Sequence, residues 1–341
     1  MQIRAHLGGL PTTTETPAGW DALRLQEAHS STSFAGNALS RHDVEELLNN
    51  RRAVGNHLLA DYLEVTGYAD AVRWVHAQAH RPSDEQAARP VTLTEIRNLH
   101  RLALRPAWHA GPPDTALDTV PGTLRARDLR PFAGWLRTPA AATVEPRLRE
   151  WLDEVNDTPS STPELVEQVA VAHTRFEQLH PFVDGNGRVG RLLVNLLLVR
   201  RGYAPVRLAA RDHARYVHAL HRSDTGDHAL LALMFARSIL DGFSQLEAAA
   251  QGAPAPLVRL SALERPGTSR VALRNAAQRG RLRAERGDDG HWRSCATWVD
   301  DYLADKYVRD PADQQDQGRR RRTAVSMPRS SASPLSRPIS E

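Results

Sequence analysis

The segment HPFVDGNGRVGR, residues 180–191, joins two stretches with helical periodicity and decides how this chain folds. Pro181 disfavours helical geometry in the residue before it, so the first helix is expected to end near His180. The run Gly185-Asn186-Gly187 permits a sharp turn and a close approach of the backbone to a ligand. A second helix is expected to start at or near Arg188. The segment therefore predicts a tight loop between two helix ends.

The side chains of this loop suit a polyphosphate. The free N–H groups and positive dipole at the start of the second helix form an anion cradle. Arg188 and Arg191 are three residues apart, so they share a helix face and can hold successive phosphates. Asp184 is a hard oxygen ligand suited to Mg²⁺. His180 would lie at a helix C-terminus, where a cationic imidazole is favoured, with a pKa that can be tuned near neutrality.

Helical patterns dominate on both sides of the loop, and the fold class they predict is mainly α. Helical periodicity runs from Trp20 to Val75 and recurs over 92–104, 146–155, 163–179, 188–201, 211–220 and 228–246. Thr94 is a candidate cap for the helix over 92–104. The helix over 188–201 is apolar nearly all round and should be the most buried. Alternation within the turn-rich stretch 111–139 predicts a short β-hairpin.

Shifts in composition divide the chain into six segments. We expect a flexible N-terminus at 1–19, a helical region at 20–90, a core domain at 91–246, a linker at 247–256, a small domain at 257–308 and a disordered basic and Ser-rich tail at 309–341. The four arginines at 319–322 belong to that tail. The chain is long enough for two domains.

Composition narrows the class of protein. The hydrophobic content is 41% of 341 residues, and the longest apolar run, Leu192 to Val199, is far too short to span a bilayer. The first residues lack an apolar signal-peptide core, and Cys295 is alone, so a cytoplasmic protein without membrane attachment is expected. Net charge is +4, but Lys306 is the one lysine among 44 basic residues. This arginine bias reflects coding composition more than selection for a polyanion, so only local clusters carry weight.

The loop also matches a family signature. HPFVDGNGRVGR fits H-P-F-x-[D/E]-G-N-G-R-x-x-R, the signature of the Fic domain, at every specified position. The preceding AHTRFEQL, residues 172–179, resembles the family's lead-in helix, and a looser resemblance extends from about residue 30 to 240. The resemblance implies a Fic-type helical bundle with a β-hairpin flap. It implies transfer of AMP from ATP to a hydroxyl of a target protein.

The resemblance assigns roles to the matching positions. His180 would deprotonate the Ser, Thr or Tyr hydroxyl of the target, and Asp184 would hold Mg²⁺ between the α- and β-phosphates. Asn186, with the backbone of Gly185 and Gly187, would stabilise charge on the α-phosphate. Arg188 would hold the β-phosphate, and Arg191 the γ-phosphate. The Doc-like branch, which phosphorylates its target, has lysine where this chain has Gly187, so glycine favours nucleotidyl transfer.

A second segment, SSTSFAGNAL at residues 30–39, resembles the self-inhibitory motif S-S-x-I-E-G-N of many Fic proteins. In those proteins the glutamate pairs with the second arginine of the signature and blocks productive ATP binding. Ser31, Gly36 and Asn37 fit the motif, but Ala35 replaces the glutamate. The clamp is therefore expected to be absent, with Arg191 free for the γ-phosphate, although Glu45 or Glu46 could substitute in space. A plain Ser-capped helix start is the alternative.

Two further segments resemble parts of the family. PGTLRARDLRPFAGWLRTP, residues 121–139, resembles its P-G-x-x-R stretch and flap, whose strand edge could align a target segment. An ordinary surface hairpin is the alternative. RDHARYVHALHRSDTGDH, residues 211–228, resembles the segment after the core helix, which implies that Tyr216 flanks the nucleotide base.

The segment 257–308 resembles a winged helix-turn-helix domain of the excisionase type. Ser261 opens a short helix, Thr268 or Ser269 caps a second, and RLRAERGDDGHWRS reads as a two-stranded wing. The candidate DNA contacts are four arginines on that helix and wing: Arg270, Arg274, Arg279 and Arg283. The alternative is an arginine-rich domain that binds protein or only packs.

Two functions from different classes remain. The first is a protein adenylyltransferase that uses ATP and Mg²⁺, acts on a target protein and carries an attached winged-helix module. The second is a DNA-binding transcriptional regulator whose Fic body serves as a nucleotide sensor or toxin-like accessory. Loss of label transfer from ATP in a His180→Ala variant would favour the enzyme. The sequence leaves a homodimer open.

Overall fold

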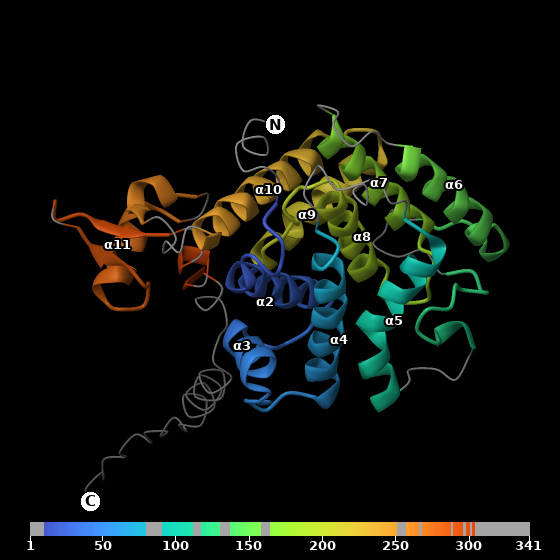
Figure 1. The fold of residues 1–341 in the computed structure, drawn as a ribbon, viewed down its shortest axis with the longest axis horizontal. Coiled ribbons are helices and arrows are strands. Elements are labelled where there is room, and N and C mark those ends of the chain that lie inside the picture. Colours follow the sequence, from blue (N-terminus) through green and yellow to red (C-terminus); the bar gives the residue numbers. More distant parts are fainter. Residues whose placement is uncertain are drawn as a thin grey trace, which may run out of the picture.

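The computed structural model describes a mainly helical body with a small C-terminal unit beside it (Figure 1). The described residues are 10–79, 91–111, 117–129, 137–157, 164–250, 257–265, 268–287, 289–295, 298–300 and 302–303. The expected tail at 309–341 lies outside them, as does most of the linker.

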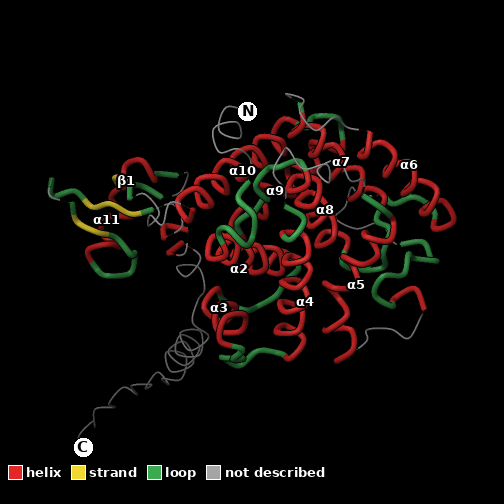
Figure 2. The backbone as a smooth tube through the Cα atoms, viewed as in Figure 1, coloured by secondary structure: helices red, strands yellow, loops and turns green. Residues whose placement is uncertain are grey.

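Helices of one to two dozen residues build the body. Their bounds are α2 Pro17–Phe34, α3 Arg41–Asn50, α4 Leu59–His76, α5 Leu93–Ala110, α6 Val144–Asp157, α7 Leu165–Leu179, α8 Asn186–Arg200, α9 His213–Asp224 and α10 Ala229–Ala250. Short 3-10 turns precede two of them, η3 Ala141–Thr143 and η4 Ala210–Asp212, and η2 Leu117–Thr119 stands alone. The tube in Figure 2 shows how little of the body is strand.

Helix α8 lies at the centre of the body, as its sequence predicts. Every residue from Leu192 to Arg200 is buried, and α2, α4, α5 and α7 pack around the helix. Asn195 and Arg200, two buried polar residues of this helix, have partners, because a buried polar group without a hydrogen bond is costly. Asn195 bonds the backbone of Val206 and the Glu27 carboxylate, and Arg200 pairs with Glu95 at 2.7 Å. These two polar side chains therefore enter the centre of the body together with hydrogen-bond partners.

Several boundaries differ from those expected. Residues 10–19 are packed rather than flexible, since Leu10 is 1% exposed and the Trp20 indole donates to the Pro11 carbonyl. Thr92, not Thr94, caps α5, because Thr92 and Glu95 form a reciprocal capping box. Helix α5 then continues through Pro106. Residues 247–250, expected in the linker, complete α10.

The expected hairpin is not formed in the part of 111–139 that the structure describes. Residues 121–129 and 137–139 contain no strand, and residues 130–136 lie outside the described part. Asp118 and Asp128 instead accept hydrogen bonds from the backbone of Ala126 and Ala141. The contact at Ala126 satisfies a backbone group of this stretch with a side chain instead of a neighbouring strand.

The C-terminal unit has a core of its own. It contains the strands β1 Val258–Arg259, β2 Glu285–Arg286 and β3 Trp292–Ser294, with η5 Leu260–Leu263 and α11 Arg270–Gln278. The strands form an antiparallel sheet of order β1-β3-β2. Eight buried apolar residues fill this core, which is separate from that of the body: Leu260, Leu263, Leu273, Ala276, Ala277, Leu282, Val299 and Leu303. Ser269 caps α11 by accepting from the Ala272 amide, as expected.

Helix α10 is the one helix among the described residues that is long and apolar enough to cross a membrane. Leu231, Phe235, Ile239, Phe243 and Leu246 are buried in the body, where α10 packs against α2, α7 and α9. A core helix passes the same test of length and composition, so this feature is weak evidence for a membrane span.

Candidate functional site

The loop between α7 and α8 has the geometry that its sequence predicts. Helix α7 ends at Leu179, and His180 adopts a left-handed conformation with φ 46°. The Asn186 carboxamide closes the loop, since its Oδ1 accepts from the Phe182 amide and its Nδ2 donates to the Phe182 carbonyl, both at 2.9 Å. Gly185 has φ 79°, and a Cβ there would lie 2.6 Å from Leu104. Only glycine meets both demands without strain.

The start of α8 presents free backbone donors to the loop. The helix begins at Asn186, two residues earlier than expected, and its N-cap Gly185 supplies no capping side chain. The Val189 amide makes the first intrahelical bond, to the Gly185 carbonyl. The N–H groups of Asn186, Gly187 and Arg188 precede it and face the N-terminal end, where an anion is favoured.

His180 is held as a neutral imidazole. Its Nδ1 lies 3.0 Å from the Glu177 carbonyl oxygen, and a carbonyl can only accept, so Nδ1 carries the proton and Nε2 the lone pair. Burial lowers the pKa of His180 to about 4, and the Arg125 guanidinium acts in the same direction. The expectation of a favoured cation at this helix end is therefore wrong, because desolvation outweighs the attraction of the helix carbonyls. A neutral imidazole with Nε2 unprotonated can accept a proton at neutral pH.

Two residues outside the motif hold the loop in place, and the sequence analysis assigned neither of them a role. The buried Arg125 donates from Nε to the His180 carbonyl and from Nη2 to the Pro139 carbonyl. His100 on α5 accepts from the Gly122 amide and donates to the Asp184 carbonyl, while its ring stacks on Phe182 with centroids 3.8 Å apart. The P-G-x-x-R pattern that contains Arg125 was the available signal. His100 gave none, because its partners lie far away in sequence.

Arg188 contacts two carboxylates. Its Nη1 donates to Glu64 on α4, and its Nη2 donates to Asp184 at 3.0 Å. The Arg188 side chain is 11% exposed and that of Glu64 14%, whereas the Asp184 side chain is 74% exposed. One partner is therefore buried and the other reaches solvent. Glu64 is a further residue of the site that the sequence analysis missed.

Arg191 is held against α2. Its Nε donates to the Ser31 hydroxyl at 2.7 Å and its Nη2 to the Ser31 carbonyl at 2.9 Å, and its guanidinium lies 5.3 Å from the centre of the Phe34 ring. Arg191 is thus engaged rather than free. Behind it, burial raises the pKa of the Glu177 carboxyl to about 7, an effect that the Arg191 charge opposes.

The segment 31–37 lies at this arginine, so the motif alignment placed it in the right region. It forms the end of α2 and the turn after it, not a Ser-capped helix start. Ala35 caps the helix and Gly36 follows with φ 95°. Asn37 points to α4, where its Nδ2 donates to the Glu64 carboxylate at 2.8 Å. Glu45 and Glu46 do not replace the missing glutamate, because they pair with Arg41 and Arg52 on the α3 side.

Two side chains that were expected to contact the ligand are buried and already hydrogen-bonded within the protein. The Asn186 carboxamide is 1% exposed and committed to Phe182, so its side chain shapes the loop. Tyr216 is 4% exposed, and its hydroxyl bonds the His173 ring at 2.7 Å, so it supports the core instead of flanking a base. The helical signal that placed Tyr216 after the core helix could not show which side of α9 faces the body.

The loop offers one carboxylate for a divalent cation. The Asp184 carboxylate is exposed, and no group of three or more His, Cys, Asp or Glu side chains suited to a metal occurs in the part of the chain that the structure describes. Mg²⁺ needs few protein ligands, since it is commonly bound by one or two carboxylates together with substrate phosphates and waters. Asp184 fits that pattern, with the nucleotide as the source of the remaining oxygens.

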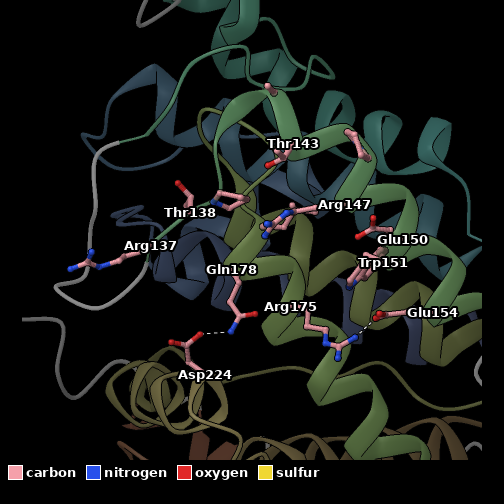
Figure 3. Close-up of a pocket in the computed structure, with 14 residues that line it drawn as sticks. Arg137, Thr138, Thr143, Arg147, Glu150, Trp151, Glu154, Arg175, Gln178 and Asp224 are labelled. Atoms are coloured by element: carbon pink, nitrogen blue, oxygen red, sulfur yellow. Dashed lines mark hydrogen bonds and ion pairs between the residues drawn. The ribbon is translucent and has the colours of Figure 1, made fainter.

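A groove of about 910 Å³ lies beside the end of α7 (Figure 3). Gln178 and Leu179, which precede His180, line one side, and Pro139 and Thr143 line another. Two contacts join residues that line it: Arg175 pairs with Glu154, and Gln178 donates a hydrogen bond to Asp224. The groove therefore lies at the C-terminal end of α7, next to the loop that begins at His180.

Comparisons with known proteins agree with the motif and the fold. Residues 90–198, which contain the loop at 180–191, match the model of the Fic/DOC family. Protein adenylyltransferase Fic of Drosophila melanogaster is 30% identical over 203 residues, which are 60% of this chain and 38% of that protein. Protein adenylyltransferase fic-1 of Caenorhabditis elegans is 27% identical over 199 residues, 58% of this chain and 36% of that one. The chain thus spans under two fifths of these relatives' length.

Solved structures share the fold. A Fic domain containing signaling protein from Bacteroides thetaiotaomicron has a TM-score of 0.59 at 24% identity, over 75% of this chain and 97% of that one. Fic-1 of Caenorhabditis elegans has the same TM-score and identity, over 73% of this chain and 69% of that one. The mainly helical Fic-like fold is therefore established for the body.

Proposed function

We propose that this protein is an adenylyltransferase that moves AMP from ATP to a hydroxyl of a target protein. One observation carries the proposal. His180 presents an unprotonated Nε2 beside a helix N-terminus that bears two arginines, so a base and an anion site meet in one loop. The names of the relatives that match this chain favour the same activity. A serine, threonine or tyrosine hydroxyl is the acceptor we propose.

The reaction needs a base and charge neutralisation. The target oxygen attacks the α-phosphorus, the bond between that phosphorus and the α–β bridging oxygen breaks, and pyrophosphate leaves. The hydroxyl proton passes to Nε2 of His180, which is neutral at pH 7 and can accept it. The free N–H groups at the start of α8 and the Arg188 and Arg191 guanidinium groups stabilise the charge on the phosphates. Mg²⁺, held at Asp184, would supply further charge neutralisation.

Gly187 favours nucleotidyl transfer over phosphoryl transfer. A Cβ at this position would lie 3.2 Å from Nη1 of Arg191, so any larger side chain would press on the guanidinium that we assign to the γ-phosphate. With glycine, Arg191 is left to hold the leaving pyrophosphate end of the nucleotide. We further propose that Ala35 leaves this chain without the glutamate clamp, so that the nucleotide does not compete with a carboxylate at position 35 for Arg191.

The test uses the purified protein with ATP labelled at either end. Label from α-³²P-ATP should become attached to protein, and label from γ-³²P-ATP should not. The His180→Ala variant should lose transfer by at least about a hundredfold, the usual contribution of a general base. His218→Ala, which changes an exposed histidine on α9, is the matched control. Transfer of γ-label, or full activity of His180→Ala, would contradict the proposal.

A second candidate function follows from the C-terminal unit. Arg270, Arg274 and Arg279 are exposed on α11 or at its end, and this unit has a core of its own. The arrangement supports a DNA-binding module of the winged-helix type, with the Fic body as sensor or accessory. Arg283 is the exception among the four arginines, because its guanidinium stacks on Trp298 at 4.1 Å. A regulator would keep its DNA binding in the His180→Ala variant.

A further inference from the structure

We infer that Glu64 is a positioning residue, which holds the Arg188 guanidinium ready for the β-phosphate of the nucleotide. The inference rests on the proposed function, because that proposal assigns the β-phosphate to Arg188. Glu64 lies on α4, 124 positions before Arg188 in the chain, and outside the signature. Its role concerns affinity for one phosphate and not the chemistry at His180.

Arg188 has two carboxylate partners of different kinds. The pair with Asp184 joins residues four apart at the start of α8, and the Asp184 side chain is 74% exposed. The pair with Glu64 joins α8 to α4, and both side chains are nearly buried, at 11% and 14% exposure. Exposed pairs of the first kind contribute little, whereas breaking a buried pair leaves an uncompensated charge.

Glu64 is itself fixed. Its second carboxylate oxygen accepts from Nδ2 of Asn37 at 2.8 Å. Asn37 has no freedom to move away, since the same nitrogen donates to the Asp61 carbonyl at 3.0 Å and Oδ1 accepts from the Leu39 amide at 3.1 Å. The turn after α2 therefore sets the Glu64 rotamer, and Glu64 sets that of Arg188.

These contacts decide which partner a nucleotide would displace. To remove Glu64, a phosphate would have to strip a buried carboxylate of its guanidinium. To remove Asp184, it needs only to replace an exposed pair within one helix turn. Guanidinium has five N–H donors, so Arg188 can keep Glu64 through Nη1 and turn Nη2 to a phosphate oxygen. Glu64 thus acts as an anchor for Arg188 and not as a competitor of the nucleotide.

The experiment compares binding of ADP and AMP by calorimetry, because these nucleotides differ by the β-phosphate. Wild-type protein should bind ADP more tightly than AMP, and Arg188→Ala should lose that advantage. Glu64→Gln keeps the shape and removes the charge. It should weaken ADP binding by about tenfold, the scale of one charge-assisted hydrogen bond, and leave AMP binding unchanged. Glu45→Gln is the control, since it removes a carboxylate from an exposed pair on α3.

Three results would overturn the inference. Tighter ADP binding by Glu64→Gln would make the carboxylate a competitor. Equal losses of affinity for ADP and AMP would show that the role of Glu64 is merely structural. Unchanged binding of both nucleotides would show that Glu64 has no role in nucleotide binding. If Glu64→Gln does not fold, the Asn37→Ala variant tests the same inference. It removes the hydrogen-bond donor that fixes Glu64, so it should weaken the binding of ADP and leave the binding of AMP unchanged. Wild-type protein that binds neither nucleotide would instead refute the proposed function, and the role of Glu64 with it.

Discussion

The arginines of α8 and those of α11 have the same side chain but different surroundings. Arg188 and Arg191 are partly buried, and residues from α2 and α4 hold each guanidinium in one orientation. Arg270 and Arg274 are exposed on one face of α11, four residues apart. Sequence alone shows only that both helices carry arginine.

The difference in surroundings distinguishes two kinds of anion binding. A guanidinium held by neighbours loses little freedom when it binds a phosphate, so it suits a small ligand bound in one orientation. An exposed arginine on a mobile stem suits a polyanion bound through many weak and salt-sensitive contacts. The predictions below should separate these two modes.

After the loss expected in His180→Ala, the largest effect is expected from a new carboxylate beside α8. Ala35→Glu adds an acid directly after Phe34, whose ring lies against the Arg191 guanidinium. If the new carboxylate pairs with Arg191, it should compete with the γ-phosphate and reduce label transfer from α-³²P-ATP by about tenfold to a hundredfold, the strength of a hydrogen bond to a charged group. Ala35→Gln has nearly the same shape without the charge and is the control.

The outcome bears on the alignment of residues 31–37 with the inhibitory motif. Unchanged self-modification in Ala35→Glu would show that position 35 does not reach the phosphate site. An equal loss in Ala35→Gln would mean that bulk at the end of α2, and not charge, is responsible. Only a loss specific to glutamate supports a missing clamp.

Local features of the site could be predicted from the sequence. The end of α7, the left-handed turn and the start of α8 follow from Pro181 and Gly185, whose effects act within one or two residues. The burial of α8 follows from its own apolar run. Such predictions depend only on the backbone and on the residues next to it.

Features that depend on tertiary contacts could not be predicted. Glu64 reads as a charged residue on an amphipathic helix, and its place beside Arg188 is set by the packing of α4 on α8. The low pKa of His180 has the same origin, because it depends on burial of the imidazole in the folded body and on the charge of Arg125, which lies 55 residues earlier in the chain. Tyr216 is the opposite case: the sequence predicted that it lies beside the nucleotide base, but its side chain is buried in the body.

A medium effect is expected from pH on the stability of the body. Burial lowers the pKa of His100, His173 and His180 to about 4, 3 and 4. Between these values and 6.5 the unfolded chain binds more protons, so stability rises with pH and falls on acidification. The raised pKa of Glu177, about 7, acts in the opposite direction between 4.5 and 7. The three histidines should outweigh it.

Urea unfolding at pH 7 and pH 5 measures this effect. Wild-type protein should lose stability at pH 5, and in His180→Ala that loss should be smaller by about 1 kcal/mol or more, roughly tenfold in the unfolding constant. His218→Ala should behave like wild type. If His180→Ala shows the full pH dependence, the imidazole is not buried as the structure places it.

The smallest effect is expected on α11. Arg274→Ala should weaken binding to a DNA duplex by severalfold and lower the slope of log affinity against log salt by about one, because one phosphate contact is lost. Arg237→Ala, which removes an exposed arginine from α10, should leave both unchanged. The measurement is fluorescence anisotropy over a salt series.

ADP binding should be equal in wild type and Arg274→Ala, because α11 lies in the unit with its own core. A slope that falls equally in both variants would assign DNA binding to the overall charge of the chain, and the distinction between the two kinds of arginine site would then be lost for α11.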